Sequence, residues 1–76
     1  MENRHASRYA QLGLNIAYYR KLKSLTQMCL AEIVGISRTH MSNIEALGVK
    51  KSISLNVLFD IAIALEVEPE KLLEMR

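Results

Sequence analysis

The stretch from Thr26 to Ser37 restricts the fold of this chain more than any other feature of the sequence. Thr26 and Ser37 are residue types that cap the N-terminus of a helix by accepting a backbone hydrogen bond. Between them, Gly35 can take the left-handed conformation that ends a helix, which other residues adopt at a cost. The pattern therefore predicts two short helices joined by a tight turn.

Apolar periodicity predicts three further helices around this pair. Leu12, Ile16 and Tyr19 recur at helical spacing in the first, Ser54 caps the fourth, and Pro69 stands at the first position of the fifth. The predicted helices cover residues 7–23, 27–34, 38–47, 55–65 and from 69 onward. The side chains expected in the core are Tyr9, Leu12, Ile16, Tyr19, Leu30, Ala31, Val34, Met41, Ile44, Leu55, Leu58, Ile61, Ala62, Leu65, Leu72 and Leu73. The expected fold is an all-α, five-helix single domain over residues 1–76, with residues 1–7 flexible.

The residue types that are scarce exclude several classes of protein. Cys29 is the only cysteine of the 76 residues, so no intramolecular disulfide forms, and no Cys/His cluster has the spacing of a metal site. Apolar stretches are short and the N-terminus has no apolar signal segment, so we expect a cytoplasmic protein without membrane contact. No serine lies in a recognisable catalytic arrangement, and no glycine-rich loop could hold a nucleotide. We therefore expect no enzyme, no cofactor and no small-molecule ligand; the Cys29 thiol is either inert or a redox sensor.

Charge is distributed unevenly along the chain. Residues 1–52 carry eight Lys or Arg against three Glu, a net charge of +5. Residues 53–76 carry two Lys or Arg against five acidic residues, a net charge of −3. A basic half beside an acidic half favours contact of one surface with a polyanion such as nucleic acid.

The helix predicted at residues 38–47 has the most informative surface. At 100° per residue, Met41 and Ile44 point to one side of it. The opposite side presents polar side chains and no acid: Arg38, Thr39, Ser42 and Asn43. A helix face that is merely solvated more often carries Glu/Lys pairs, whereas these four residue types can read the edges of bases. Two short helices joined by a turn also form the unit that places its second helix in the major groove of DNA.

One pattern spans both helices of this unit: Thr26-Gln27-x-x-Leu30-Ala31-x-x-Val34-Gly35-Ile36-Ser37-x-x-x-Met41-Ser42-x-Ile44-Glu45. It resembles the helix-turn-helix of XRE-type regulators, the family of the lambdoid phage repressors and Cro proteins. The similarity extends from Leu12 to Leu73, through Ala64-Leu65-x-Val67-x-Pro69. It implies a lambda-repressor-like fold with the helix-turn-helix at residues 26–47. It also implies a sequence-specific double-stranded DNA-binding regulator of transcription, most simply a repressor.

The resemblance assigns roles to individual residues. The positions that touch bases in the family match Arg38, Thr39, Ser42 and Asn43. The positions that touch phosphates match Gln27, His40, Lys50, Lys51 and Asn56. Arg20 and Glu45 match an ion pair that ties the first helix to the end of the third. Ser24 stands where many members have Gly, so we expect a backbone strain of up to ~1 kcal/mol there.

A single recognition helix offers few contacts for tight specific binding, so we expect a homodimer on a near-palindromic operator. The apolar residues expected at the dimer interface are Ile63, Val67, Leu72 and Met75. Two other functions remain open. One is a protein-interaction module such as an antitoxin or regulatory subunit, for which an antagonist protein would be the partner. The other is RNA binding, which the scarcity of aromatic residues disfavours.

Overall fold

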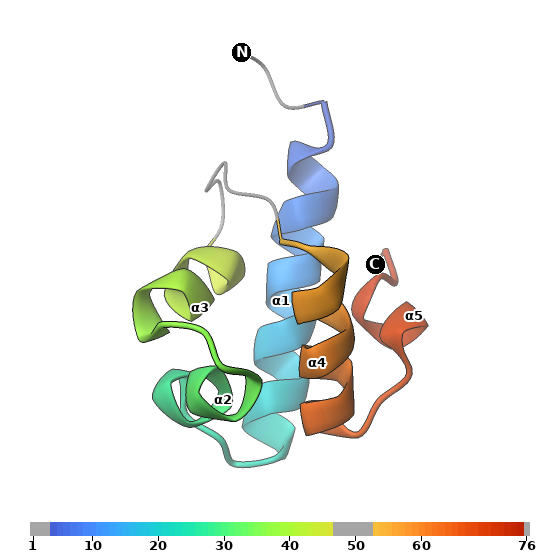
Figure 1. The fold of residues 1–76 in the computed structure, drawn as a ribbon. Coiled ribbons are helices and arrows are strands. Elements are labelled where there is room, and N and C mark those ends of the chain that lie inside the picture. The colour runs from blue at the N-terminus through green and yellow to red at the C-terminus, as the bar shows by residue number, and fades with distance from the viewer. Residues whose placement is uncertain (1–3, 47–52, 76) are drawn as a thin grey trace.

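The computed structural model describes residues 4–46 and 53–75, and this part of the chain contains five α-helices. The helices are α1 (Ala6–Leu22), α2 (Gln27–Val34), α3 (Arg38–Glu45), α4 (Leu55–Leu65) and α5 (Pro69–Leu72). α1 and α4 occupy the middle of the molecule, with α2 and α3 on one side and α5 on the other (Figure 1). The predicted all-α, five-helix class is confirmed.

Side-chain caps set the residues at which α2, α3 and α4 begin. The hydroxyl oxygens of Thr26, Ser37 and Ser54 accept hydrogen bonds of 3.0, 2.9 and 3.1 Å from backbone N–H groups in the first turn of each helix. Each of these bonds satisfies an N–H group that has no partner within its helix, which stabilises the protein by about 1 kcal/mol. Gly35 ends α2 with φ 79°, in the left-handed region, so the predicted tight turn is present.

The helix ends differ from the prediction at three places. α1 begins at Ala6, one residue before the predicted start, and ends at Leu22, one residue before the predicted end. α3 ends at Glu45 because the next residue, Ala46, already has an extended backbone with ψ 136°. The remainder of the predicted third helix, Leu47, lies outside the described residues. Within the described residues, no helix has both the length and the apolar character needed to cross a membrane.

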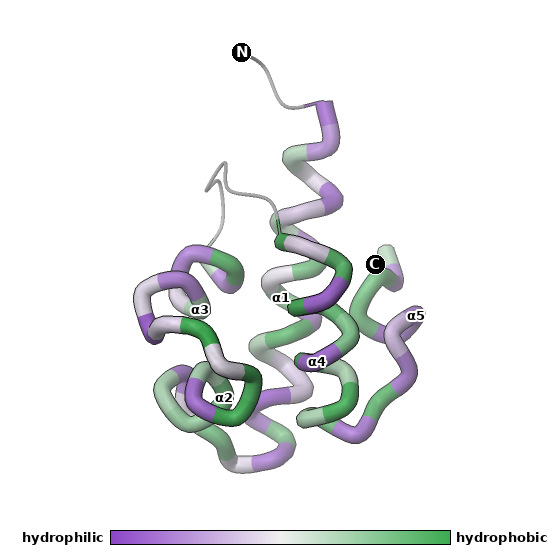
Figure 2. The backbone as a smooth tube through the Cα atoms, in the orientation of Figure 1, coloured by the Kyte–Doolittle hydropathy of each residue, from purple (hydrophilic) through white to green (hydrophobic). Residues whose placement is uncertain are grey.

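The core forms where α1 and α4 meet the three shorter helices. Its buried apolar side chains are Leu12, Ile16, Leu30, Ala31, Met41, Ile44, Leu58, Ile61, Ala62, Leu65 and Leu72. α4 contributes the most of these, and it is coloured largely hydrophobic in Figure 2. The assignment of Leu55 and Leu73 to the core is wrong, because their residues are 65% and 54% exposed. Leu55 is the first residue of α4 and Leu73 follows the last residue of α5, and both line an open cavity instead of the core.

Two turns of the described chain hold a non-glycine residue in the left-handed region, Ser24 with φ 59° and Glu66 with φ 60°. Ser24 follows α1, and its positive φ is the conformation for which the sequence analysis expected strain. Glu66 caps the C-terminus of α4. The two turns are joined by an ion pair between the Lys23 ammonium and the Glu66 carboxylate. The hydrogen bond and the positive charge of Lys23 lower the pKa of Glu66.

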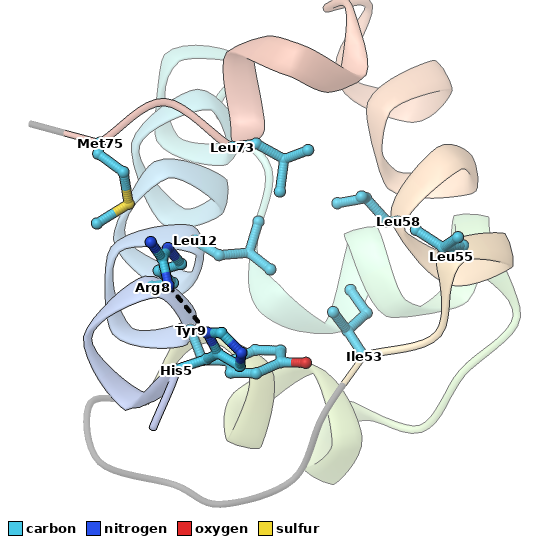
Figure 3. Close-up of a pocket in the computed structure, with 9 residues that line it drawn as sticks. All are labelled: His5, Arg8, Tyr9, Leu12, Ile53, Leu55, Leu58, Leu73 and Met75. Carbon is cyan, nitrogen blue, oxygen red and sulfur yellow. Dashed lines mark hydrogen bonds between the residues drawn. The ribbon is translucent and has the colours of Figure 1, made fainter. Parts of the chain in front are cut away.

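A cavity of about 360 Å³ opens between α1, α4 and the segment that follows α5 (Figure 3). It is lined by His5, Arg8, Tyr9, Leu12, Ile53, Leu55, Leu58, Leu73 and Met75. At its rim, Nη1 of Arg8 donates a 2.9 Å hydrogen bond to Nδ1 of His5. The remaining wall is mostly apolar, so hydrophobic surface faces solvent at this side of the protein.

Candidate nucleic-acid interface

α3 lies at the surface with one side packed on the core and the other open. Met41 is fully buried and Ile44 is 8% exposed, so these two side chains attach α3 to the rest of the fold. The predicted base-contacting residues, in contrast, keep part or most of their surface open to solvent. Arg38 and Thr39 are exposed, whereas Ser42 and Asn43 are half-buried. Together, Arg38, Thr39, Ser42 and Asn43 give one short helix several hydrogen-bond donors and acceptors near its surface.

The residues expected to touch phosphates are spread over several elements. Gln27 is the first residue of α2, His40 lies in α3, and both are half-buried. Asn56 is exposed in the first turn of α4. Lys50 and Lys51 lie outside the described residues. Of the three described residues, Gln27 and His40 therefore lie within the helix-turn-helix, and Asn56 lies outside it.

The structure brings Arg20 of α1 and Glu45 of α3 together in a two-point contact. Nε and Nη2 of Arg20 donate hydrogen bonds of 2.8 and 2.9 Å to Oε2 and Oε1 of Glu45. The side chains of this pair are only 10% and 5% exposed. Nη1 of Arg20 also donates to the backbone oxygen of Leu25 at 2.7 Å, and Nε2 of Gln27 donates to Oε1 of Glu45 at 3.0 Å. These bonds link α1, the loop after it, α2 and α3 at one buried point.

Gly13 is a positioning residue that the sequence analysis missed. It lies in α1 where α3 crosses, and a Cβ atom added there would lie 2.5 Å from the backbone oxygen of Ile44 and 3.1 Å from Cα of Glu45. Only a glycine lets the two backbones approach this closely. The available signal was a glycine on the inward side of a helix, next to Leu12, because such a position often marks a close backbone contact.

We expect Gly13→Ala to lower the stability of the protein and to displace α3. Overpacking a close contact costs ~1–3 kcal/mol. The better helix propensity of Ala offsets ~1 kcal/mol of this, so a net loss of up to about 2 kcal/mol should appear in urea unfolding. Gly35 provides the control, because nothing lies within 4 Å of a Cβ added there. Gly35→Asn tests only the positive φ and should be tolerated better; a gain of stability in Gly13→Ala would show that α1 and α3 separate without cost.

The predicted dimer-interface residues differ in their exposure. Ile63 and Met75 are 74% and 56% exposed, whereas Val67 is half-buried against the core. The assignment of Leu72 to the interface is wrong, because a side chain without exposed surface cannot contact a partner chain. Sequence reasoning also missed two exposed apolar residues on α4, Leu55 and Phe59. They precede Ile63 at helical spacing, so the three side chains form one stripe.

The chemistry available at this surface is hydrogen bonding and charge. Across residues 4–46 and 53–75, no three His, Cys, Asp or Glu side chains are grouped so that they could hold a metal ion. Cys29 is an exposed free thiol in the first turn of α2. The amide, hydroxyl and guanidinium groups of α3 and α2 are suited to bases and phosphates.

Comparison with known proteins identifies this arrangement. A helix-turn-helix family model matches residues 16–72, which include α2, α3, α4, α5 and the C-terminal part of α1. The crystal structure of the restriction-modification controller protein C.AhdI from Aeromonas hydrophila is similar, with a TM-score of 0.82 and 28% identity over 92% of this chain and 99% of that one. No curated protein matches the chain. The chain therefore belongs to the XRE-type helix-turn-helix family of DNA-binding transcription regulators.

Proposed function

We propose that this protein is a sequence-specific regulator that occupies double-stranded DNA as a homodimer and represses transcription from the occupied site. The observation that carries this proposal is the open polar side of α3, supported from behind by the buried Met41 and Ile44. A rigid support matters because a base contact needs its donor held in a fixed direction. The protein acts in the cytoplasm by occupancy, without catalytic chemistry, metal or cofactor.

In this proposal α3 enters the major groove of DNA. Arg38, exposed in the first turn, donates two hydrogen bonds to guanine, while Thr39, Ser42 and Asn43 contact neighbouring bases. Phosphates are contacted by Gln27, His40, Lys50, Lys51 and Asn56. Phosphate contacts set the position of α3, and base contacts select the sequence.

We expect Arg38→Ala to lower affinity for the preferred duplex by about 5- to 150-fold, since a two-point Arg–guanine contact is worth ~1–3 kcal/mol. Sequence preference should relax at one base pair. The preferred duplex is first obtained by selecting bound sites from random double-stranded DNA, and binding is then measured at fixed salt. The matched variant is Arg38→Lys, which keeps the charge but loses the planar two-donor geometry. If Arg38→Ala weakens binding equally on all sequences and Arg38→Lys restores it, Arg38 contacts a phosphate.

The homodimer is proposed to form through the apolar side of α4 and the segment after α5. The surface consists of Leu55, Phe59, Ile63, Leu73 and Met75, all at least 45% exposed. Leu55, Leu73 and Met75 also line the cavity between α1 and α4 (Figure 3). α3 and α5 lie on different sides of the central helices in Figure 1, so pairing there leaves both recognition helices free for DNA. A two-fold pair would place them ~34–36 Å apart on one face of a near-palindrome.

We expect Ile63→Glu and Met75→Glu to raise the dissociation constant of the dimer at least about tenfold, because an unpaired charge would be buried at the interface. Sedimentation of the intact chain and the variants at micromolar concentration measures this. Leu14→Glu is the matched control, since Leu14 is 48% exposed on α1, outside the proposed surface. An intact protein that sediments as a monomer and binds single half-sites as tightly as paired ones would exclude the dimer.

Similarity to C.AhdI supports one setting for this regulator, the control of restriction-modification genes. The selected DNA sequence tests this setting directly. It should occur upstream of a restriction or methyltransferase gene in the source genome. Its occurrence only upstream of unrelated genes would contradict this setting and leave the DNA-binding proposal intact.

A further inference from the structure

We propose that Arg20 and Glu45 are positioning residues for Gln27, holding its side-chain amide in one orientation toward a DNA phosphate before DNA binds. This inference rests on the proposed DNA-binding function and deepens it. The three side chains come from α1, α3 and α2 and meet at a single carboxylate. The buried ion pair would therefore act in DNA recognition as well as in folding.

The orientation of Gln27 follows from the chemistry of Glu45. Oε1 of Glu45 accepts from Nη2 of Arg20 at 2.9 Å and from Nε2 of Gln27 at 3.0 Å. An ionised carboxylate only accepts hydrogen bonds, so the nitrogen and not the oxygen of the Gln27 amide faces it. The amide nitrogen has two hydrogens, and the contact with Glu45 uses one. The second N–H is thereby left as a donor in a fixed direction at the start of α2.

Arg20 has a separate role in this arrangement. An uncompensated carboxylate next to a phosphate-binding side chain would repel DNA. The two-point contact with Arg20 neutralises Glu45 and holds it, since the Glu45 side chain is only 5% exposed. Holding Gln27 before binding also removes part of the rotamer entropy that a free glutamine side chain would lose on contact with DNA. The ion pair thus increases the affinity gained from an uncharged side chain.

A double-mutant cycle on DNA affinity tests the proposal. In the unmodified protein, we expect Gln27→Ala to weaken binding to the selected duplex by about two- to tenfold, the effect of one hydrogen bond. The slope of affinity against salt should not change, because Gln27 is uncharged. In the Arg20→Met/Glu45→Leu protein, where the amide has lost its partner, Gln27→Ala should change affinity by less than about twofold. Equal losses in the two backgrounds would overturn the proposal.

Two further measurements separate positioning from loss of the fold. The control Gln11→Ala removes a similar amide bond, from Nε2 of Gln11 to Oδ1 of Asn15 at 2.9 Å, and should leave DNA affinity unchanged. If Arg20→Met/Glu45→Leu does not fold, ¹⁵N relaxation of the Gln27 side-chain amide in the unmodified, DNA-free protein replaces the cycle. The amide should be ordered on the ps–ns timescale, and a mobile amide would refute positioning. If Gln27→Ala has no effect while Arg38→Ala does, the positioning proposal fails and the proposed function stands.

Discussion

Removing either partner of the Arg20–Glu45 pair should destabilise the protein by ~3–5 kcal/mol, because the remaining charge stays buried without compensation. Each single variant also loses one further hydrogen bond. Arg20→Met removes the 2.7 Å bond to the Leu25 backbone oxygen, and Glu45→Leu removes the 3.0 Å bond from Nε2 of Gln27. Urea-unfolding midpoints of both single variants and of the double variant measure these losses.

The double variant distinguishes an interacting pair from two independent residues. Replacing both members with apolar side chains leaves no buried charge, so the combined loss should be well below the sum of the single losses. Lys23→Met is the surface control. Its partner Glu66 is exposed, and breaking an exposed ion pair should change the urea midpoint little. A combined loss equal to the sum of the single losses would show that Arg20 and Glu45 do not interact.

Asn15→Ala should lower the free energy of unfolding by about 2–3 kcal/mol, since it leaves backbone acceptors without donors. Asn15 is 1% exposed in α1 and its Nδ2 donates to the backbone oxygens of Leu72 at 2.9 Å and Glu74 at 2.8 Å. These two bonds hold the end of α5 and the segment after it against α1. Urea unfolding measures the loss of stability. We also expect weaker dimerisation in sedimentation, because this segment carries Leu73 and Met75.

Gln11→Ala provides the matched control for Asn15→Ala. It removes only the part-buried bond to Oδ1 of Asn15, so its loss should stay below ~1 kcal/mol. If Asn15→Ala unfolds at the urea midpoint of the unmodified protein, water satisfies the Leu72 and Glu74 oxygens and Asn15 does not hold the segment.

Helix positions could be predicted from the sequence because their signals are local. The hydroxyl of Thr26, Ser37 or Ser54 accepts from an N–H group within the same first turn, so capping needs no distant residue. The positive φ of Gly35 likewise follows from its own lack of a Cβ. The strained turn at Ser24 was expected from the family resemblance instead, because many members have Gly at this position.

The side of α3 that faces outward was predictable for a similar reason. The helical period alone places Met41 and Ile44 on a different side from Thr39, and the burial of the two apolar residues agrees. The family pattern added the roles of these positions. Those roles stay predictions until DNA binding by the variants is measured.

Contacts between distant segments could not be read from the sequence, because they depend on which backbones meet. The sequence does not distinguish Asn15 from the exposed polar residues of α1. Its role depends on the backbone oxygens of Leu72 and Glu74, which accept its hydrogen bonds only in the folded chain. From the sequence, Gly13 is only a residue of low helix propensity within a helix. The structure shows that the backbone of α3 crosses α1 at this position.

The helical period predicts which side of a helix is apolar, but it does not predict which of these apolar residues a neighbouring helix covers. For this reason Leu55 and Leu73 were assigned to the core and are exposed, while Leu72, assigned both to the core and to an interface, is buried in the core. The sequence by itself determined the caps, the turn and the polar side of α3, since each depends on residues a few positions apart. Only the tertiary structure decided the close crossing at Gly13, the anchor at Asn15 and the exposed apolar surface, since each depends on groups brought together by folding.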